Sequence, residues 1–422
     1  MGKSVMIKKD KERLRNLAGK YTEYACGQPM VERREKWRVH NRLQEKTYPF
    51  HIEDNGSYFQ DLTPPLECED RECRDLEARL LGAVVAYEVI DDDRIIPDRF
   101  VVDWCTPSSS GCDELQITRA DNGHGSSLGY KTSQPIKDID ADWGKLSKRT
   151  ISLDREQTER RAQLAKETFA GFLPVEIGRT SSMYSSGITN KAVHLMGMQE
   201  LYLQMAMNPD AVHRLFTFLA EDNQALGQWE EDQNLLTLNH DGNQGYCTGS
   251  SLFSDETARP AANPVVSKDR YGYLESQESA GISADMFDEF LMPHFTRLAD
   301  KFKLLMFGCC EAVHNLMPVL QRLPGLRKVS VTPWCDLHRL TETCRRDIIW
   351  CRKPIPLKLC GETFDRDDLR HHLQETLDIG KDFFIEFVYR DTNLLTGSMT
   401  DRVAQTCDMI RDMTRHPEGR RG

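Results

Sequence analysis

The chain has 422 residues, of which 39% are hydrophobic, and 55 Lys+Arg against 66 Asp+Glu give it a formal net charge of −11. This acidic balance argues against nucleic acid as a main partner, because polyanion-binding domains concentrate an excess of Lys and Arg. No apolar stretch reaches the ~18 residues that a membrane helix needs, and residues 1–9 lack the apolar core of a signal peptide. We therefore expect a cytoplasmic protein that binds neither nucleic acid nor membranes.

The sequence contains thirteen cysteines. A secreted disulfide framework would have an even number of cysteines in a small domain behind a signal peptide. None of these features is present, so we expect mostly reduced thiols. Most would be small buried hydrophobes, and the useful question is whether a few lie where a metal or a reaction needs a thiolate.

The N-terminal part of the chain is predicted to be helical. Two charged helices, 7–24 and 31–43, are followed by a third at 67–89. We expect residues 1–98 to form an N-terminal helical extension. Residues 99–150 differ in composition from the helical segments before them, because a short strand is followed by Ser/Gly-rich sequence. Long loops of this kind tend to be functional or mobile. This stretch is expected to be a loop-rich insertion or a lid, and the sequence does not assign its role.

From residue 151 onward, helices of 10–18 residues, among them 285–302 and 312–323, alternate with short apolar strands. This pattern is typical of βαβ units and a parallel sheet. With 100–104, the expected strands are 173–177, 235–239, 271–275, 304–307, 328–331, 347–350 and 383–388. Eight strands and no Gly-x-Gly-x-x-Gly turn favour a closed (β/α)8 TIM-type barrel over an open doubly wound sheet. Its bulk would span residues 151–415.

The chemistry of such a barrel belongs to the carboxyl ends of its strands. Thiol, carboxylate, imidazole and cationic side chains follow the predicted strands: His240, Asp241, Glu275, Glu278, Cys309, Cys310, Glu311, Trp334, Cys351, Arg352, Lys353, Arg390 and Asp391. Catalytic zinc usually has three protein ligands and one open position. Cys310 and Cys351 lie at the ends of two predicted strands that are close enough for both thiolates to bind one ion. Glu278 could supply a third donor. The alternative is that these cysteines simply pack at the rim.

Four segments carry a resemblance to a known family. Residues 277–283 (QESAGIS), 307–311 (FGCCE), 326–334 (LRKVSVTPW) and 350–354 (WCRKP) resemble a branch of the uroporphyrinogen decarboxylase superfamily. This branch includes the substrate-demethylating methyltransferases of anaerobic O-demethylase systems. The resemblance covers about residues 160–410, is most specific in the last 150, and implies a (β/α)8 barrel.

The sequence departs from the family pattern in two places. The Arg-rich signature with which the decarboxylase binds porphyrinogen carboxylates is absent, which disfavours that reaction. Better-known methyltransferase relatives bind zinc through His-x-Cys and a later Cys, and here Gly308 stands at the His position. Cys310 is then the matching thiolate. The resemblance points to Glu278 and Cys351 as the other zinc ligands, with Cys309 and Glu311 as substitutes.

The resemblance implies methyl transfer. A methyl group would pass from a methylated small molecule, such as an aromatic methyl ether, to the Co(I) of a corrinoid (cobalamin). A separate corrinoid protein would carry this cofactor, because the chain lacks the Asp-x-His-x-x-Gly pattern that holds it. Zn²⁺ would polarise the atom that bears the methyl group. His240, Asp241 and Tyr246 are the residues expected to protonate the leaving group or orient the substrate.

Three further residues are expected to contact the substrate: Trp334, Arg352 and Lys353. Two other functions remain open. A decarboxylase of another acid would use rim Arg, Lys and Asp without a metal, and a non-catalytic member would only bind a corrinoid protein or a small ligand. Relatives are often dimeric, so a homodimer is one option for the assembly, which the sequence does not decide.

Overall fold

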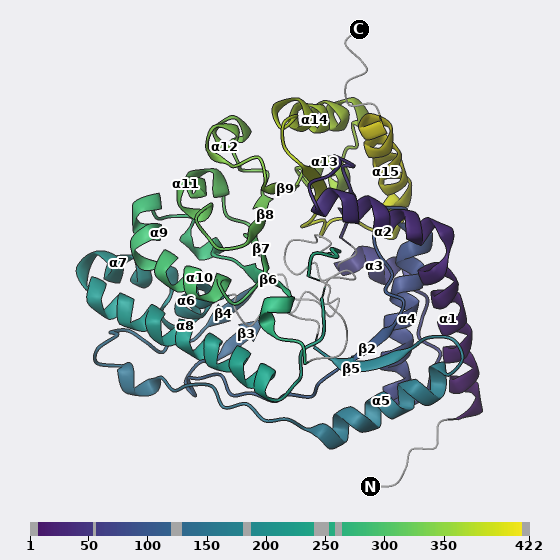
Figure 1. Cartoon of the computed structure of the whole chain (residues 1–422), viewed down its shortest axis with the longest axis horizontal. Helices are drawn as coiled ribbons and strands as arrows, with labels where there is room; N and C mark the ends of the chain where they lie inside the picture. Colours follow the sequence, from purple (N-terminus) through teal and green to yellow (C-terminus); the bar gives the residue numbers. More distant parts are fainter. Residues whose placement is uncertain are drawn as a thin grey trace.

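The computed structural model describes residues 7–53, 56–119, 129–179, 187–239, 253–257 and 264–415. Its main feature is a six-stranded, all-parallel, curled sheet with the strand order β1-β10-β9-β8-β7-β6, which helices surround (Figure 1). The strands are β1 (Phe50–Ile52), β6 (Tyr271–Leu274), β7 (Leu304–Phe307), β8 (Leu326–Val331), β9 (Ile349–Arg352) and β10 (Ile385–Tyr389). Because all six run parallel, their carboxyl ends meet at one rim.

Helices lie around this sheet. They are α6 (Ile188–Met196), α7 (Met198–Met207), α8 (Pro209–Asp232), α9 (Ala284–Phe290), α10 (Met292–Ala299), α11 (Met317–Leu320), α12 (Leu337–Thr343), α13 (Leu357–Cys360), α14 (Arg366–Ile379) and α15 (Thr400–Arg415). Side-chain caps fix several starts; for example, the Asp365 carboxylate accepts hydrogen bonds from the amides of Asp367 and Asp368. The helices cover the outer face of the curled sheet.

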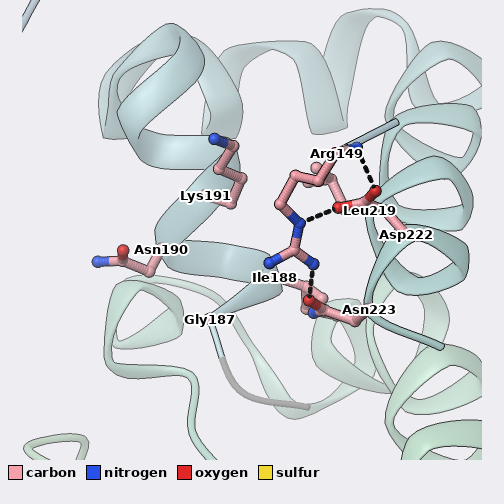
Figure 2. A pocket seen from close by; sticks show the side chains of 8 residues that line it. All are labelled: Arg149, Gly187, Ile188, Asn190, Lys191, Leu219, Asp222 and Asn223. Carbon is pink, nitrogen blue, oxygen red and sulfur yellow. Dashed lines mark hydrogen bonds and ion pairs between the residues drawn. The ribbon is translucent and has the colours of Figure 1, made fainter. Parts of the chain in front are cut away.

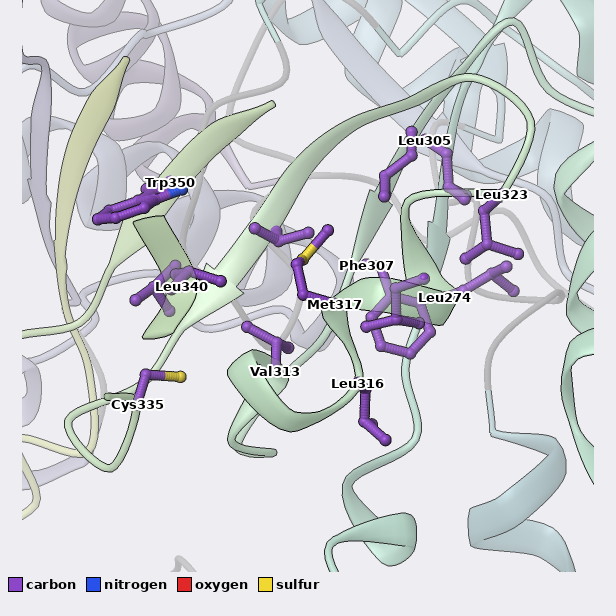
Figure 3. Packing of buried hydrophobic residues seen from close by; sticks show 14 of the residues in the cluster. Leu274, Leu305, Phe307, Val313, Leu316, Met317, Leu323, Cys335, Leu340 and Trp350 are labelled. Atoms are coloured by element: carbon purple, nitrogen blue, oxygen red, sulfur yellow. The ribbon is translucent and has the colours of Figure 1, made fainter. Parts of the chain in front are cut away.

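The outer face of the sheet forms the main hydrophobic core. Phe307 and Trp350 project from β7 and β9 into a cluster with residues of the helical segments beside them, including Met317 and Leu340 (Figure 3). Successive strand residues point to opposite faces. The residues between these apolar ones, such as Cys351 beside Trp350, must therefore face the interior of the curl.

The N-terminal layer has a core of its own. It comprises α1 (Lys8–Cys26), α2 (Gln28–Asn41), α3 (Gly56–Leu62), α4 (Arg71–Val89), α5 (Arg155–Phe169), and the parallel pair β2 (Phe100–Asp103) and β5 (Val175–Gly178). Trp37, Leu80 and Phe169 are fully buried in this second cluster. The predicted N-terminal helices are confirmed, and residues 50–52 of the same region also supply an edge strand of the main sheet.

The predicted barrel is found in part. The α/β architecture is confirmed, but within the described ranges the main sheet is a half-barrel rather than a closed ring of eight strands. A single parallel bridge joins Arg179, next to β5, to Leu236. The predicted strand at 235–239 is therefore reduced to this one bridge. The short hairpin of β3 (Ile117–Arg119) and β4 (Tyr130–Thr132) lies within the 99–150 excursion.

Proline explains two differences in the helices. The expected helix at 285–302 is divided into α9 and α10 at Leu291. Pro293 has no amide hydrogen, so it cannot continue the series of backbone hydrogen bonds of α9. The expected helix at 312–323 is a 3-10 turn followed by the four-residue α11, which starts beside Pro318. Within the described ranges, no helix combines the length and the apolar character needed to cross a bilayer.

Candidate functional site

The inner face of the half-barrel is partly polar. Ser330, Cys351 and Glu386 are register partners on β8, β9 and β10, so their side chains lie on one face. Tyr273 and Met306 pack around Cys351 in a small cluster separate from the outer core. The residues that continue this face beyond the strand ends form the rim of the half-barrel, and that is where chemistry is expected.

Cys310 is the exposed thiol at this rim, three residues after β7. Its Sγ lies 3.5 Å from Sγ of the buried Cys309. The hydrogen bond with Cys309, together with the positive charges of Lys353 and Arg390, lowers the pKa of Cys310 to about 7 against the opposing effect of burial. A substantial fraction of Cys310 is therefore a thiolate at neutral pH.

A fixed backbone presents the two thiols. Gly308 has φ +104°, in the left-handed region that favours glycine, and an added Cβ there would lie 3.2 Å from Cβ of Ser330. The buried Glu311 carboxylate accepts hydrogen bonds from the backbone amides of Ser276 (2.9 Å) and Cys309 (2.7 Å). Glu311, which was predicted as a substitute ligand, thus joins the turn after β7 to the turn after β6.

Charged residues from three strand ends surround Cys310. The buried Lys353 ammonium, after β9, donates to the carbonyl of Cys309. Arg390, after β10, pairs with Glu53, after β1, at 3.1 Å, and the amide of Asp391 donates to the other Glu53 oxygen. Burial raises the pKa of Glu53 in spite of the Arg390 charge. We call Glu53, Cys310, Lys353, Arg390 and Asp391 the rim cluster.

Cys351 lies deeper than the rim cluster. It is fully buried, and its thiol donates to Glu386 Oε1 at 2.7 Å. Glu386 Oε2 pairs with Lys328 Nζ at 2.6 Å, and both side chains of this ion pair are inaccessible to solvent. Cys351 is therefore part of a buried network on the inner face, and its thiol is not directed at Cys310.

Glu278 lies at the opposite side of the site, in the 3-10 turn after β6. Its carboxylate accepts hydrogen bonds from Thr189 (2.9 Å) and from Asn190 (2.8 Å), both on α6. Asn190 also borders a cavity of about 210 Å³ between α6 and α8, where Arg149 donates to Asp222 and Asn223 (Figure 2). Glu278 thus connects β6 to α6 beside this cavity.

The predicted zinc ligands do not form a ready-made site. Within the described ranges, no three His, Cys, Asp or Glu side chains lie close enough together to hold a metal ion. Glu278 and Cys351 each have hydrogen-bond partners of their own, and Glu311 holds two backbone amides. Of the predicted donors, only Cys310 presents an exposed thiolate. These positions do not fit a three-ligand zinc site, and we derive no reaction step through a metal.

The other predicted site residues divide into three groups. Lys353 lies in the rim cluster, and Trp334, after β8, is 71% exposed at the same rim. Arg352 points to the outer face instead, where it donates to the carbonyl of Thr332 at 2.6 Å and lies beside Thr376 of α14. Its position does not support a direct substrate contact. His240, Asp241 and Tyr246 lie outside the described residues.

Glu53 and Glu386 were not among the predicted site residues. Glu53 was assigned to a helical extension, although the alternation of Phe50 and Ile52 with polar residues is a strand signal that could have found it. Glu386 stands inside an apolar run, and a charge at that position signals an inward-facing residue that needs a buried partner.

Comparisons with known proteins agree with this architecture. No family model matches the sequence, and no curated protein matches it. Among solved structures, a methyltransferase from Methanosarcina mazei is similar over 91% of this chain and 99% of its own, with a TM-score of 0.52 and 11% sequence identity. At this identity the likeness shows the fold alone. The chain therefore has an α/β half-barrel fold similar to that of a known methyltransferase.

Proposed function

We propose that this protein is a methyltransferase that takes a methyl group from a methylated small molecule, such as an aromatic methyl ether. The acceptor would be the Co(I) of a corrinoid carried by a separate protein. The observation that carries the proposal is the rim cluster, which combines an exposed thiolate with two cations at the carboxyl ends of the strands. The similarity in fold to a methyltransferase supports it.

The residues of the rim cluster suit the removal of a methyl group from oxygen. Breaking the C–O bond leaves negative charge on the substrate oxygen, and positive groups placed beforehand stabilise such charge. Lys353 and Arg390 supply two positive groups beside Cys310. Zinc is an implication of the family resemblance alone, which would make Cys310 a ligand, and no step of the proposal depends on a metal.

A direct assay tests the proposed function. The protein is mixed with a reduced corrinoid protein and a series of aryl methyl ethers, and absorbance follows conversion of Co(I) to methyl-Co(III). We expect conversion with the wild type and a loss of at least tenfold in Cys310→Ser. The matched control is Cys26→Ser, because Cys26 is also exposed but lies at the end of α1. The absence of conversion with every ether would contradict the proposal.

A metal-independent decarboxylase is the second candidate. It is favoured by the presence of Lys353, Arg390 and Asp391 at one rim, because cations bind a substrate carboxylate and a nearby acid can protonate the resulting carbanion. The two candidates differ in product. Release of CO₂ from a carboxylic acid in the absence of corrinoid, unchanged by a chelator, would favour the decarboxylase.

A further inference from the structure

An imidazole faces the inner side of the half-barrel from β1. His51 is the register partner of Val388, which is two residues from Glu386 on β10. Paired residues of a parallel sheet share a face, so His51 projects to the same side as Glu386 and Arg390. Its neighbours Phe50 and Ile52 point the other way, into the outer core. His51 is thus placed on the face that leads to the rim cluster.

A buried carboxylate holds His51 in one orientation. Nδ1 of His51 lies 3.2 Å from Oδ2 of Asp92, whose side chain is inaccessible to solvent. Asp92 is itself fixed, since it accepts the backbone amide of Ile52 at 2.9 Å and pairs with Arg94 at 2.8 Å. Arg94 and His51 keep the pKa of Asp92 well below its usual value in spite of burial. Asp92 is therefore a permanent anion behind the imidazole.

The contact with Asp92 uses only one of the two ring nitrogens of His51. The side chain is 15% exposed, and within the described residues no group hydrogen-bonds Nε2. The charged groups near the ring are Asp92, Arg94 and Glu53, together with Arg390 and Asp391, which directly follow β10. An imidazole whose Nδ1 is held by a carboxylate, with Nε2 accessible, is the usual arrangement of a general acid or base.

We propose that His51 is the proton donor to the leaving oxygen, positioned by Asp92; this inference rests on the methyltransferase function proposed above. As the methyl group passes to Co(I) of the partner protein, the C–O bond breaks and its electron pair stays on the oxygen. The proton on Nε2 of the imidazolium moves to that oxygen, which leaves as the phenol, and His51 becomes neutral.

The test compares ethers whose leaving groups differ in acidity. General acid catalysis contributes about 10²–10⁴-fold, so we expect His51→Gln to slow demethylation of a methoxybenzoate at least a hundredfold. Demethylation of a nitrophenyl methyl ether, whose phenolate needs no proton to leave, should fall less than tenfold. Substrate binding, measured by calorimetry, should be unchanged. The matched control is His371→Gln, an exposed histidine on α14.

A second variant separates the chemical role from a structural one. Added imidazole should restore part of the methoxybenzoate rate of His51→Ala, which a structural defect would not permit. Equal losses with both ethers, or no rescue by imidazole, would overturn the assignment of His51 while leaving the methyltransferase function intact. An inactive wild type would instead contradict the proposed function, and the proton-donor role with it.

Discussion

Cys310 differs from the other cysteines through its surroundings. Burial raises the pKa of Cys344 to about 11 and that of Cys68 to about 12. Cys310 lies instead beside a donating thiol and two cations, which lower its pKa to about 7. Since the thiolate is the reactive form, Cys310 should dominate the thiol chemistry of the cysteines that the structure describes.

This difference predicts selective alkylation. At pH 7 and low iodoacetamide, Cys310 should be modified first, and its modification rate should rise with pH around a midpoint near 7. Peptide mass spectrometry of the native protein measures both. Cys26, which is also exposed, serves as the internal reference. A midpoint for Cys310 above pH 8.5 would show that the thiolate is not stabilised.

Zinc content tests how the two predicted cysteine ligands differ. Because Cys351 donates to Glu386 within the buried network, we expect Cys351→Ser to retain the zinc content of the wild type. Cys310→Ser should lose at least half of any bound zinc. Elemental analysis of protein purified without a metal-affinity tag gives both values. Equal loss of zinc in the two variants would contradict this expectation. It would support the zinc site of Glu278, Cys310 and Cys351 that the family resemblance implies.

A buried ion pair links β8 and β10 on the inner face of the sheet. Lys328 on β8 and Glu386 on β10 contact one another across β9, whose Cys351 also bonds Glu386. A buried pair of this kind adds little net stability relative to apolar residues, yet losing one partner leaves an unpaired charge in the interior. The ion pair therefore fixes how the strands are arranged more than it adds to stability.

A pair of variants tests this description. Lys328→Met should lower the free energy of unfolding by about 3–5 kcal/mol, because Glu386 remains buried without its cation. The double variant Lys328→Met/Glu386→Gln should lose clearly less, because neither of the two positions then carries a charge. Urea unfolding followed by circular dichroism measures both. If the single variant were no less stable than the double one, the ion pair would not be the determining interaction.

For the molecule as a whole, buried histidines set part of the pH response. Burial lowers the pKa of both His294 and His372 from 6.5 to about 4. In the unfolded chain they take up protons near pH 6.5, and in the folded state only near pH 4. The stability linked to their neutral forms is therefore complete above pH 6.5 and is lost as the pH falls toward 4. Buried carboxyls with raised pKa, such as Glu230, act in the opposite direction.

A variant isolates the histidine contribution. Each histidine contributes up to ~1.4 kcal/mol per pH unit within this window. The loss in unfolding free energy between pH 7 and pH 5 should therefore be smaller in His372→Gln than in the wild type. His371→Gln, in which the neighbouring exposed histidine is changed, should behave like the wild type. Urea unfolding at the two pH values measures the difference, and identical losses in all three proteins would contradict it.

The strands of the main sheet were easier to predict from the sequence than the helix breaks. The strands around 304–307, 328–331 and 383–388 were predicted because their apolar runs are bounded by helical patterns, and the structure confirms each. The helix at 285–302 was predicted as one piece, since periodicity alone does not register the break at Pro293. The position of Cys310 at the rim followed from its place after a strand.

The sequence by itself determined the parallel α/β pattern and the side of the sheet on which the chemistry lies, because strand alternation and chain direction are local properties. Only the tertiary structure decided that Cys351 bonds Glu386 rather than facing Cys310. It also decided that Arg352 faces α14, and that β1 brings His51 and Glu53 next to β10. These outcomes depend on strand register, and a shift of one residue in register moves a side chain to the opposite face.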